Sequence, residues 1–218
     1  MARNKHPEET VKMILDTAAR LFTEKGYEKA SLQDIINETG LSKGAIYHHF
    51  ASKEEIFVRI CERIGEENSA VLLKIRNDKT LNGCDKLKTL FKTALLHANQ
   101  SVVLNMTPYL LDNPKFLAMQ IRQLYEDVVP NFVQPILEEG VSDGSLKAEH
   151  PKELAEVLMI LADVWLHPLM VPTSSESMKN RCQVFDQILR GMGMDLLDDE
   201  MTAAYIHYSE LLNGQKDR

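Results

Sequence analysis

The chain has few cysteines and no long apolar run. Its three cysteines (Cys61, Cys84 and Cys182) are odd in number and far apart, so neither a disulfide framework nor a zinc knuckle is indicated. No segment approaches the ~18 consecutive apolar residues that a membrane-spanning helix needs. The first nine residues are polar and charged, unlike a signal peptide. We therefore expect a protein of the reducing cytoplasm, without a membrane or export signal.

Sequence signatures of catalysis are also missing. The chain has no G-x-S-x-G, P-loop, H-E-x-x-H or glycine-rich dinucleotide turn, and its carboxylate pairs have surface spacing. His48 and His49 are adjacent, so on a helix they diverge by roughly 100° and do not face one metal ion. The other histidines have no second histidine or cysteine one helical turn away. We expect no enzyme activity, no cofactor and no metal.

The net charge of −7 at first argues against a nucleic-acid partner, because phosphate binding usually leaves a basic surface. The acidity, however, lies entirely in the C-terminal part. Residues 1–63 hold ten basic and ten acidic side chains, whereas the rest of the chain holds fifteen and twenty-two. Several acids of the first segment fall in first helical turns, where the helix dipole favours them. The net charge of the whole chain therefore does not exclude DNA binding by the N-terminal part.

Apolar residues recur at helical spacing through almost the whole chain, and no segment alternates with the period of two typical of strands. We predict an all-α protein in which a three-helix DNA-binding domain (residues 1–53) is joined by a long helix to a helical bundle (54–218) for ligand binding and dimerisation. Pro130 and Pro135 are expected to kink or split the helix they interrupt. The expected helices cover residues 7–25, 31–39, 43–50, 52–76, 84–99, 101–111, 114–140, 151–171, 175–193 and 199–213.

The stretch from Gly40 to Phe50 is the clearest sign of function. Gly40 permits a sharp turn after a short helix, Ser42 is placed to cap the next one, and Ile46 and Phe50 are spaced to hold that helix inward. The outward residues are one cation, two residues with almost no side chain and three polar-tipped rings: Lys43, Gly44, Ala45, Tyr47, His48 and His49. Such a surface suits a DNA groove and predicts a helix-turn-helix, the alternative being a packing unit without nucleic acid.

Two C-terminal segments predict self-association. Residues 154–166 are apolar on nearly every side, with only Asp163 interrupting the run from 157 to 166, and a helix that is apolar all round must be buried all round. One face would meet its own core and the other a second copy, the alternative being a central helix in a monomer. A two-fold dimer is the commonest oligomer and suits paired DNA half-sites. The expected interface residues are Leu154, Leu158, Leu161, Trp165, Met178, Cys182, Phe185 and Leu189.

These residues resemble the TetR family of bacterial transcriptional regulators. The resemblance covers residues 10–57, and the ordered set of motifs is highly specific although no single piece is. The remaining residues share only the general character of the family, which is an all-α region ending in two helices that form the dimer. The matching runs are Ala18–Phe22, Lys25–Tyr27, Ser31–Ile35, Thr39–Phe50 and Ser52–Glu54.

The resemblance implies a homodimer whose two second helices enter successive major grooves of a roughly palindromic operator. Such proteins usually repress, and release DNA when a small molecule enters the C-terminal domain. By position, Lys53 would contact a phosphate, and Ser31 with Gln33 would meet the DNA backbone. The full set of expected DNA-binding residues is Ser31, Gln33, Ser42, Lys43, Gly44, Ala45, Tyr47, His48, His49 and Lys53.

The expected effector is a small molecule that is partly apolar or aromatic, because aromatic residues and methionines of the C-terminal part are suited to line its site. Each of them is equally suited to a core. The alternative function is an architectural or cell-cycle DNA-binding protein that has the same N-terminal domain and takes no small molecule. The expected lining residues are Met106, Tyr109, Phe116, Tyr125, Trp165 and His167.

Overall fold

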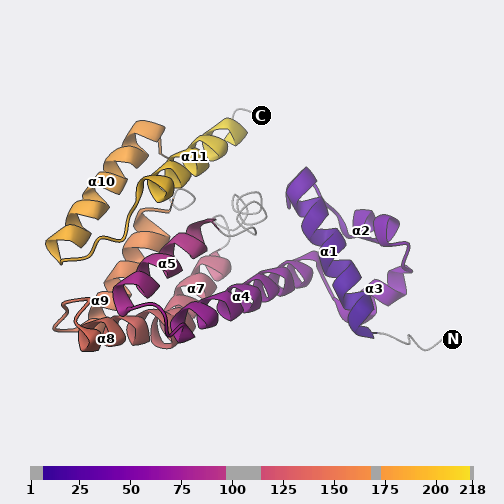
Figure 1. Cartoon of the computed structure of the whole chain (residues 1–218). Coiled ribbons are helices and arrows are strands. Elements are labelled where there is room, and N and C mark those ends of the chain that lie inside the picture. The colour runs from indigo at the N-terminus through magenta and orange to yellow at the C-terminus, as the bar shows by residue number, and fades with distance from the viewer. Residues whose placement is uncertain (1–6, 97–113, 168–172, 217–218) are drawn as a thin grey trace. The chain divides into compact units, whose positions relative to one another are not determined.

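The computed structural model describes residues 7–96, 114–167 and 173–216. Every regular element in these ranges is a helix, which confirms the predicted all-α class (Figure 1). The described residues form two compact units, of which the first ends at Asn68 and the second begins at Ser69. The domain boundary expected after residue 53 stays a prediction.

Four helices build the first unit: α1 (Pro7–Lys25), α2 (Leu32–Thr39), α3 (Lys43–His49) and α4 (Lys53–Asn77), which continues into the second unit. The short helices α2 and α3 lie beside α1 (Figure 1). An aromatic cluster links α1 to α4, in which the Tyr27 ring lies 5.1 Å from Phe22 and 5.0 Å from Phe57, edge-on to both. The apolar side chains buried in this unit include Ile14, Leu15, Ala18, Leu21, Ile35, Ile46, Phe50, Ile56 and Ile60.

The ends of α2 and α3 follow the signals expected from the sequence. The Ser31 hydroxyl accepts from the Asp34 N–H and the Asp34 carboxylate accepts from the Ser31 N–H, so the predicted capping box is confirmed. Gly40 ends α2 with φ +67, a left-handed conformation that glycine adopts without strain. The Ser42 hydroxyl caps α3 by accepting from the Ala45 N–H. These local hydrogen bonds fix the turn between the two helices.

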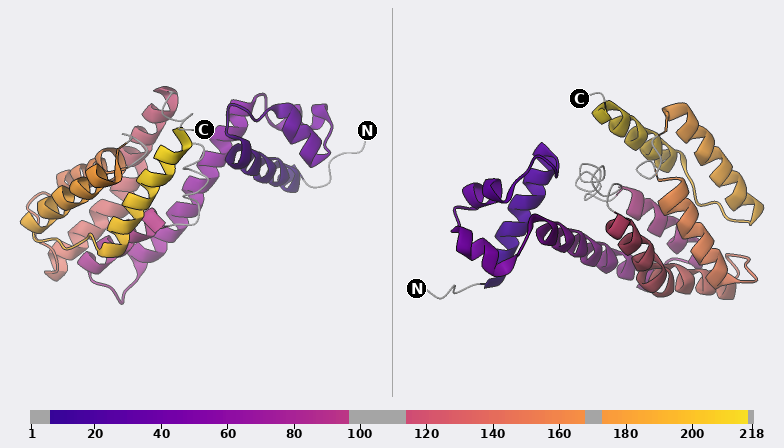
Figure 2. Two further views of the ribbon diagram at one scale, coloured as in Figure 1. Left: turned by 90° about the horizontal axis from the view of Figure 1, so that it is seen from above. Right: turned by 180° about the vertical axis from the view of Figure 1, so that it is seen from behind.

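The second unit is a bundle whose helices share one apolar core. Its C-terminal helices α10 and α11 pack side by side (Figure 2). The bundle buries, among others, Leu87, Leu90, Phe91, Val133, Ile136, Leu137, Leu158, Ala162, Met178 and Phe185. Its helices, besides the end of α4, are α5 (Gly83–Leu96), α7 (Pro114–Gln123), α8 (Gln134–Asp143), α9 (Pro151–Ile160), α10 (Ser175–Gly191) and α11 (Asp199–Lys216).

The helix expected over residues 114–140 is continuous but changes its hydrogen-bond register. Between α7 and α8 lies a π-helical segment, η1 (Leu124–Val133), which contains Pro130. A proline inside an α-helix removes one hydrogen bond and clashes with the preceding turn, and the wider π register absorbs this disruption. A second π-helical segment, η2 (Leu161–Trp165), continues α9. The helix expected over residues 101–111 lies outside the described residues.

Helices α5 and α8 approach each other closely at a pair of glycines. A Cβ atom added to Gly83 would lie 2.2 Å from the Gly140 Cα, so only glycine fits there. One turn along α5, the fully buried Lys86 ammonium donates to both carboxylate oxygens of Glu139, at 2.7 and 2.6 Å. A charge in the core is tolerated only when it is paired in this way.

Replacing Glu139 by leucine should therefore lower the free energy of unfolding by about 3 kcal/mol, because it leaves the buried Lys86 ammonium without its hydrogen-bonded carboxylate. The double variant with Lys86→Met should recover most of this loss, since no unpaired charge then remains in the core. Denaturant unfolding of both variants measures the difference. An equal loss in the single and the double variant would contradict this role of the ion pair.

Candidate nucleic-acid interface

Helix α3 has one buried and one accessible side. Ile46 is fully buried and Phe50, which follows the helix, is 5% exposed, so both hold α3 against the first unit. Tyr47 is 45% exposed although its ring is large and mostly apolar. A large ring that is left uncovered on a short, well-capped helix is typical of a binding surface.

The remaining outward residues of α3 form a continuous polar strip. The Lys43 ammonium lies 5.6 Å from the centre of the Tyr47 ring, one helical turn away. The rings of His48 and His49 are 5.1 Å apart and nearly perpendicular, with His48 exposed and His49 half-buried. Gly44 is exposed and a Cβ atom added there would meet nothing within 4 Å, so its own chain does not require glycine at this position. The strip thus combines ring edges, a cation and a place for close approach.

Other expected DNA-binding residues use their side chains within the first unit. Ser31 and Ser42 are both helix caps, and Gln33 donates to the Asn37 side chain at 2.9 Å. A hydrogen bond from the Lys25 ammonium, followed by those from the Ser31 hydroxyl and amide, holds the pKa of the Asp34 carboxyl well below its usual range. The N-terminus of α2 is thereby already faced by a carboxylate, and DNA contact by Ser31 or Gln33 stays a prediction.

Lys53 lies at the start of α4 and is half-buried. Its ammonium donates to the carbonyl oxygens of Tyr27 (2.8 Å) and Ala30 (2.9 Å). It also lies 4.1 Å from the centre of the Tyr27 ring, within the range of a cation–π interaction. The structure therefore brings Lys53 to the turn between α1 and α2.

Most of the cations described in the first unit are paired with carboxylates. Lys43 differs from them, because no carboxylate of the described residues lies within ion-pair distance of its ammonium. An unpaired cation beside exposed rings is available to a partner of opposite charge. The ion pairs of this unit are Lys12–Asp16, Arg20–Glu24, Arg20–Glu38, Lys25–Asp34, Arg59–Glu62, Arg59–Glu66 and Arg63–Asp16.

The residues expected to line an effector site are only partly described. Met106 and Tyr109 lie outside the described residues, as does the side chain of Phe116. Trp165 is half-buried, and its ring lies 5.8 Å from the Arg181 guanidinium. His167 is also half-buried, and burial lowers the pKa of its imidazole to about 4, so the ring is neutral at pH 7.

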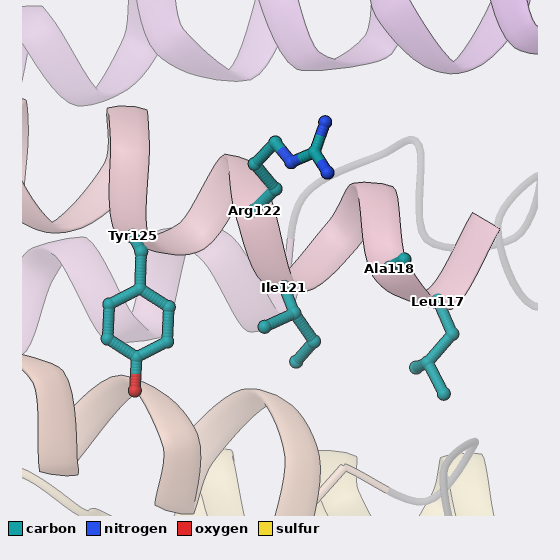
Figure 3. Close-up of a pocket in the computed structure, with 5 residues that line it drawn as sticks. All are labelled: Leu117, Ala118, Ile121, Arg122 and Tyr125. Atoms are coloured by element: carbon teal, nitrogen blue, oxygen red, sulfur yellow. The ribbon is translucent and has the colours of Figure 1, made fainter. Parts of the chain in front are cut away.

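Tyr125 lines a hollow of about 560 Å³ that the sequence did not indicate. Its other lining residues are Leu117, Ala118, Ile121 and Arg122, all on α7. Leu117, Ile121 and Tyr125 recur every four residues and point to one side, whereas the Arg122 guanidinium points away from them (Figure 3). The repeat at four-residue spacing was readable in the sequence, but it equally fits a core-facing helix. The volume is in the range of about 300–1,000 Å³ typical of small-molecule sites.

The expected dimer residues divide into two groups. Leu158, Met178, Cys182, Phe185 and Leu189 are buried in the core of the protomer itself, each at most 2% exposed, so they present no surface to a partner. Leu154, Leu161 and Trp165 are half-buried. The apolar side chains left exposed on the C-terminal helices are others, namely Val157, Val184, Ile188 and Leu211. The apolar spacing on α10 thus marked the face that packs inward.

In residues 7–96, 114–167 and 173–216, no three side chains among His, Cys, Asp and Glu come together as a metal site would require. Within the same ranges, no helix carries an apolar stretch long enough to cross a bilayer.

Comparison with known proteins identifies the family. Residues 14–60, which contain α2, α3 and the start of α4, match the family described as "Bacterial regulatory proteins, tetR family". The transcriptional repressor AcnR of Corynebacterium glutamicum is 25% identical over 191 residues, covering 87% of this chain and 97% of its own. The repressor KstR2 of Rhodococcus jostii is 29% identical over 154 residues, covering 65% and 70%.

The fold agrees with this identification. The crystal structure of a transcriptional regulator from Cytophaga hutchinsonii is 18% identical and superposes with a TM-score of 0.65, covering 95% of this chain and 96% of the other. AcnR and KstR2 are both named as helix-turn-helix transcriptional repressors. The chain is therefore a DNA-binding transcriptional regulator of the TetR family.

Proposed function

We propose that the protein binds a roughly palindromic operator as a homodimer and represses transcription until a small molecule releases it. The exposed side of α3, with Lys43 unpaired and Tyr47 uncovered, is the observation that supports DNA reading best. Since the target is the chromosome, we propose that the protein works in the cytoplasm.

Each residue of the strip has a role in this proposal. Lys43 binds phosphate or a guanine edge, and Tyr47 packs its ring against the sugar or a thymine methyl group. Gly44 and Ala45 let the helix axis come close to the bases, which agrees with the open space around Gly44. His48 and His49 provide ring nitrogens at the rim of the same strip.

The dimer we propose uses the outer faces of α10 and α11. Val184 (45% exposed) and Ile188 (38%) lie one turn apart on α10, and Leu211 (44%) is exposed on α11. Since α10 and α11 pack side by side, a second copy of this pair would complete a four-helix bundle around a two-fold axis (Figure 2). This arrangement would cover side chains that the protomer leaves in water.

Replacing both Val184 and Ile188 by glutamate should convert the dimer into a folded monomer. It would place like charges across the two-fold axis and bury carboxylates without partners, weakening association at least about 100-fold. Sedimentation velocity measures the change. Val141→Glu is the matched control, because Val141 is equally exposed (38%) but lies on α8. A double variant that remains dimeric would contradict this interface.

The effector site we propose includes the hollow beside α7. Leu117, Ile121 and the Tyr125 ring give it an apolar wall, and the Tyr125 hydroxyl can hydrogen-bond a polar group of the ligand (Figure 3). This lining fits an effector that is largely apolar or aromatic. Binding would shift α4, which continues from one unit into the other, and so change the separation of the two reading helices from the ~34–36 Å that successive major grooves require.

Selection of bound duplexes from a random DNA pool tests the proposal, repeated with a library of candidate small molecules. The proposal expects a two-fold symmetric sequence, and at least one compound that both stabilises the protein against heat and releases the duplex. Failure to enrich any sequence would contradict DNA reading. Enrichment without a releasing compound would favour the ligand-independent alternative.

A further inference from the structure

Asp163 is the one charged residue in the apolar run from residue 157 to 166, and neither DNA reading nor the proposed dimer makes use of it. It lies in the π-helical segment η2, and π-helical turns occur often at functional sites. Ala162 beside it is 3% exposed and Leu166, less than one turn later, is fully buried, whereas Asp163 is exposed. An accessible acid thus lies between buried apolar neighbours.

The accessible surface of Asp163 lies inside the second unit. Burial is the first cause that raises the pKa of the Tyr205 hydroxyl on α11, and the charge of Asp163 is the second. Tyr205 is only 4% exposed, so Asp163 is directed toward the interior of the bundle. Burial also raises the pKa of the Asp163 carboxyl to about 6, which would not happen to a group in open water. Asp163 therefore projects into an internal hollow, which water-sized molecules can enter and which protein surrounds.

Among the residues that the structure describes, no hydrogen bond or ion pair joins Asp163 to another side chain. His167 follows four residues later, but its imidazole is neutral at pH 7 and is no counter-ion. The Arg181 guanidinium is directed to Trp165, where it donates to the carbonyl oxygen at 3.0 Å and lies 5.8 Å from the ring centre. An enclosed carboxylate without a partner costs free energy, and such groups are typical of sites that bind another molecule.

We propose that Asp163 is the anionic group of an internal ligand site in the second unit, and that this site binds a small organic cation, such as a protonated amine with an apolar or aromatic body. The ammonium of the ligand would supply the charge and the N–H donors that the carboxylate lacks. The neutral His167 ring would not repel it. Asp163 is not among the residues that line the hollow beside α7, so this site adds to the one proposed above.

The test is thermal unfolding of the full chain with a library of small amines, each paired with the alcohol of the same carbon skeleton. At least one amine should raise the melting temperature by about 3 °C or more at neutral pH, and its alcohol should not. Asp163→Asn keeps the shape of the side chain and removes its charge, so it should weaken binding of that amine at least about tenfold in a calorimetric titration. Glu153→Gln is the matched control, because Glu153 is an exposed acid on α9, and it should keep full affinity.

The same variant gives a second result without any ligand. Asp163→Asn should leave the melting temperature unchanged or raise it, because the charge that it removes has no partner in the protein. A melting temperature lower by about 3 °C or more, or a variant that does not fold, would show that the carboxylate holds the fold and would overturn the proposal. A library without a stabilising amine, or an amine that binds Asp163→Asn with full affinity, would overturn it too.

This inference rests on the proposed function only in that the bound cation is expected to release DNA. An amine that binds through Asp163 but does not release the selected duplex would contradict the proposed release and leave the cation site in place. Release by an uncharged compound, in a protein that binds no amine, would overturn the cation site and leave the proposed function intact.

Discussion

Gly83→Ala is expected to lower the free energy of unfolding by about 3 kcal/mol or more, the largest stability loss we expect from a single methyl group. The added Cβ would lie 2.2 Å from the Gly140 Cα, 2.3 Å from the Gly140 N and 2.9 Å from the Ile136 carbonyl oxygen. These are backbone atoms, which cannot rotate away as a side chain would. Helices α5 and α8 would have to separate.

Separation of the helices would also break hydrogen bonds that hold the start of α5. The Gly83 N–H donates to the Asp143 carboxylate at 2.8 Å, and the Cys84 N–H donates to the Ser145 hydroxyl at 3.1 Å. Hydrogen bonds from Ser145 and from the Gly83 N–H keep the pKa of the Asp143 carboxyl below its usual value. The methyl group and the lost hydrogen bonds therefore act in the same direction.

Gly191→Ala is the matched control for this experiment. Gly191 is the last residue of α10, is exposed, and offers an added Cβ open space. Since alanine is favoured over glycine in helices by up to about 1 kcal/mol, this variant should be as stable as the original or slightly more so. Thermal and denaturant unfolding of both variants give the comparison. A Gly83→Ala protein of unchanged stability would show that the two helices are not locked at this crossing.

The parts of the fold that could be predicted from sequence are those that depend on residues close together in the chain. The capping box of Ser31 and Asp34, the stop at Gly40 and the cap at Ser42 each need a partner only a few residues away, so their spacing is readable. The same holds for the inward anchors Ile46 and Phe50. This explains why the outline of the helix-turn-helix could be predicted and was found.

Contacts between residues that are far apart in the chain leave no comparable spacing pattern in the sequence. The carbonyl oxygens of Tyr27 and Ala30 are backbone atoms that every residue possesses, so the sequence could not show that they bind Lys53. The close approach of Gly83 to Gly140 joins residues from two helices, and neither glycine alone reveals it. A tertiary contact becomes visible only when the packing of the helices is known.

The expected dimer interface shows a different limit of prediction from sequence. Spacing identifies an apolar stripe on a helix but not what covers it. On α10 the stripe of Met178, Cys182, Phe185 and Leu189 is covered by the protomer itself, and the pair Val184 and Ile188 remains outside. Helix α9 is likewise less buried than its composition suggested, since Val157 is 51% exposed.

Simultaneous replacement of Lys43 and Tyr47 by alanine should abolish operator binding and leave the fold intact. Each good contact to a base is worth about 1–3 kcal/mol, so the loss of two contacts in each subunit should weaken binding at least about 100-fold. Both side chains are exposed, and surface substitutions of this kind change stability by only about 0.5 kcal/mol. Arg59→Ala is the control, because it removes one cation from an exposed ion-paired site on α4.

The affinity of this double variant for the selected duplex is the most direct test that α3 reads DNA. A gel-shift titration, run beside the unaltered protein and Arg59→Ala, should show at least about a 100-fold loss for the double variant alone, with an unchanged melting temperature and an unchanged dimer. Full affinity in a folded Lys43→Ala, Tyr47→Ala protein would contradict the placement of α3 in the groove.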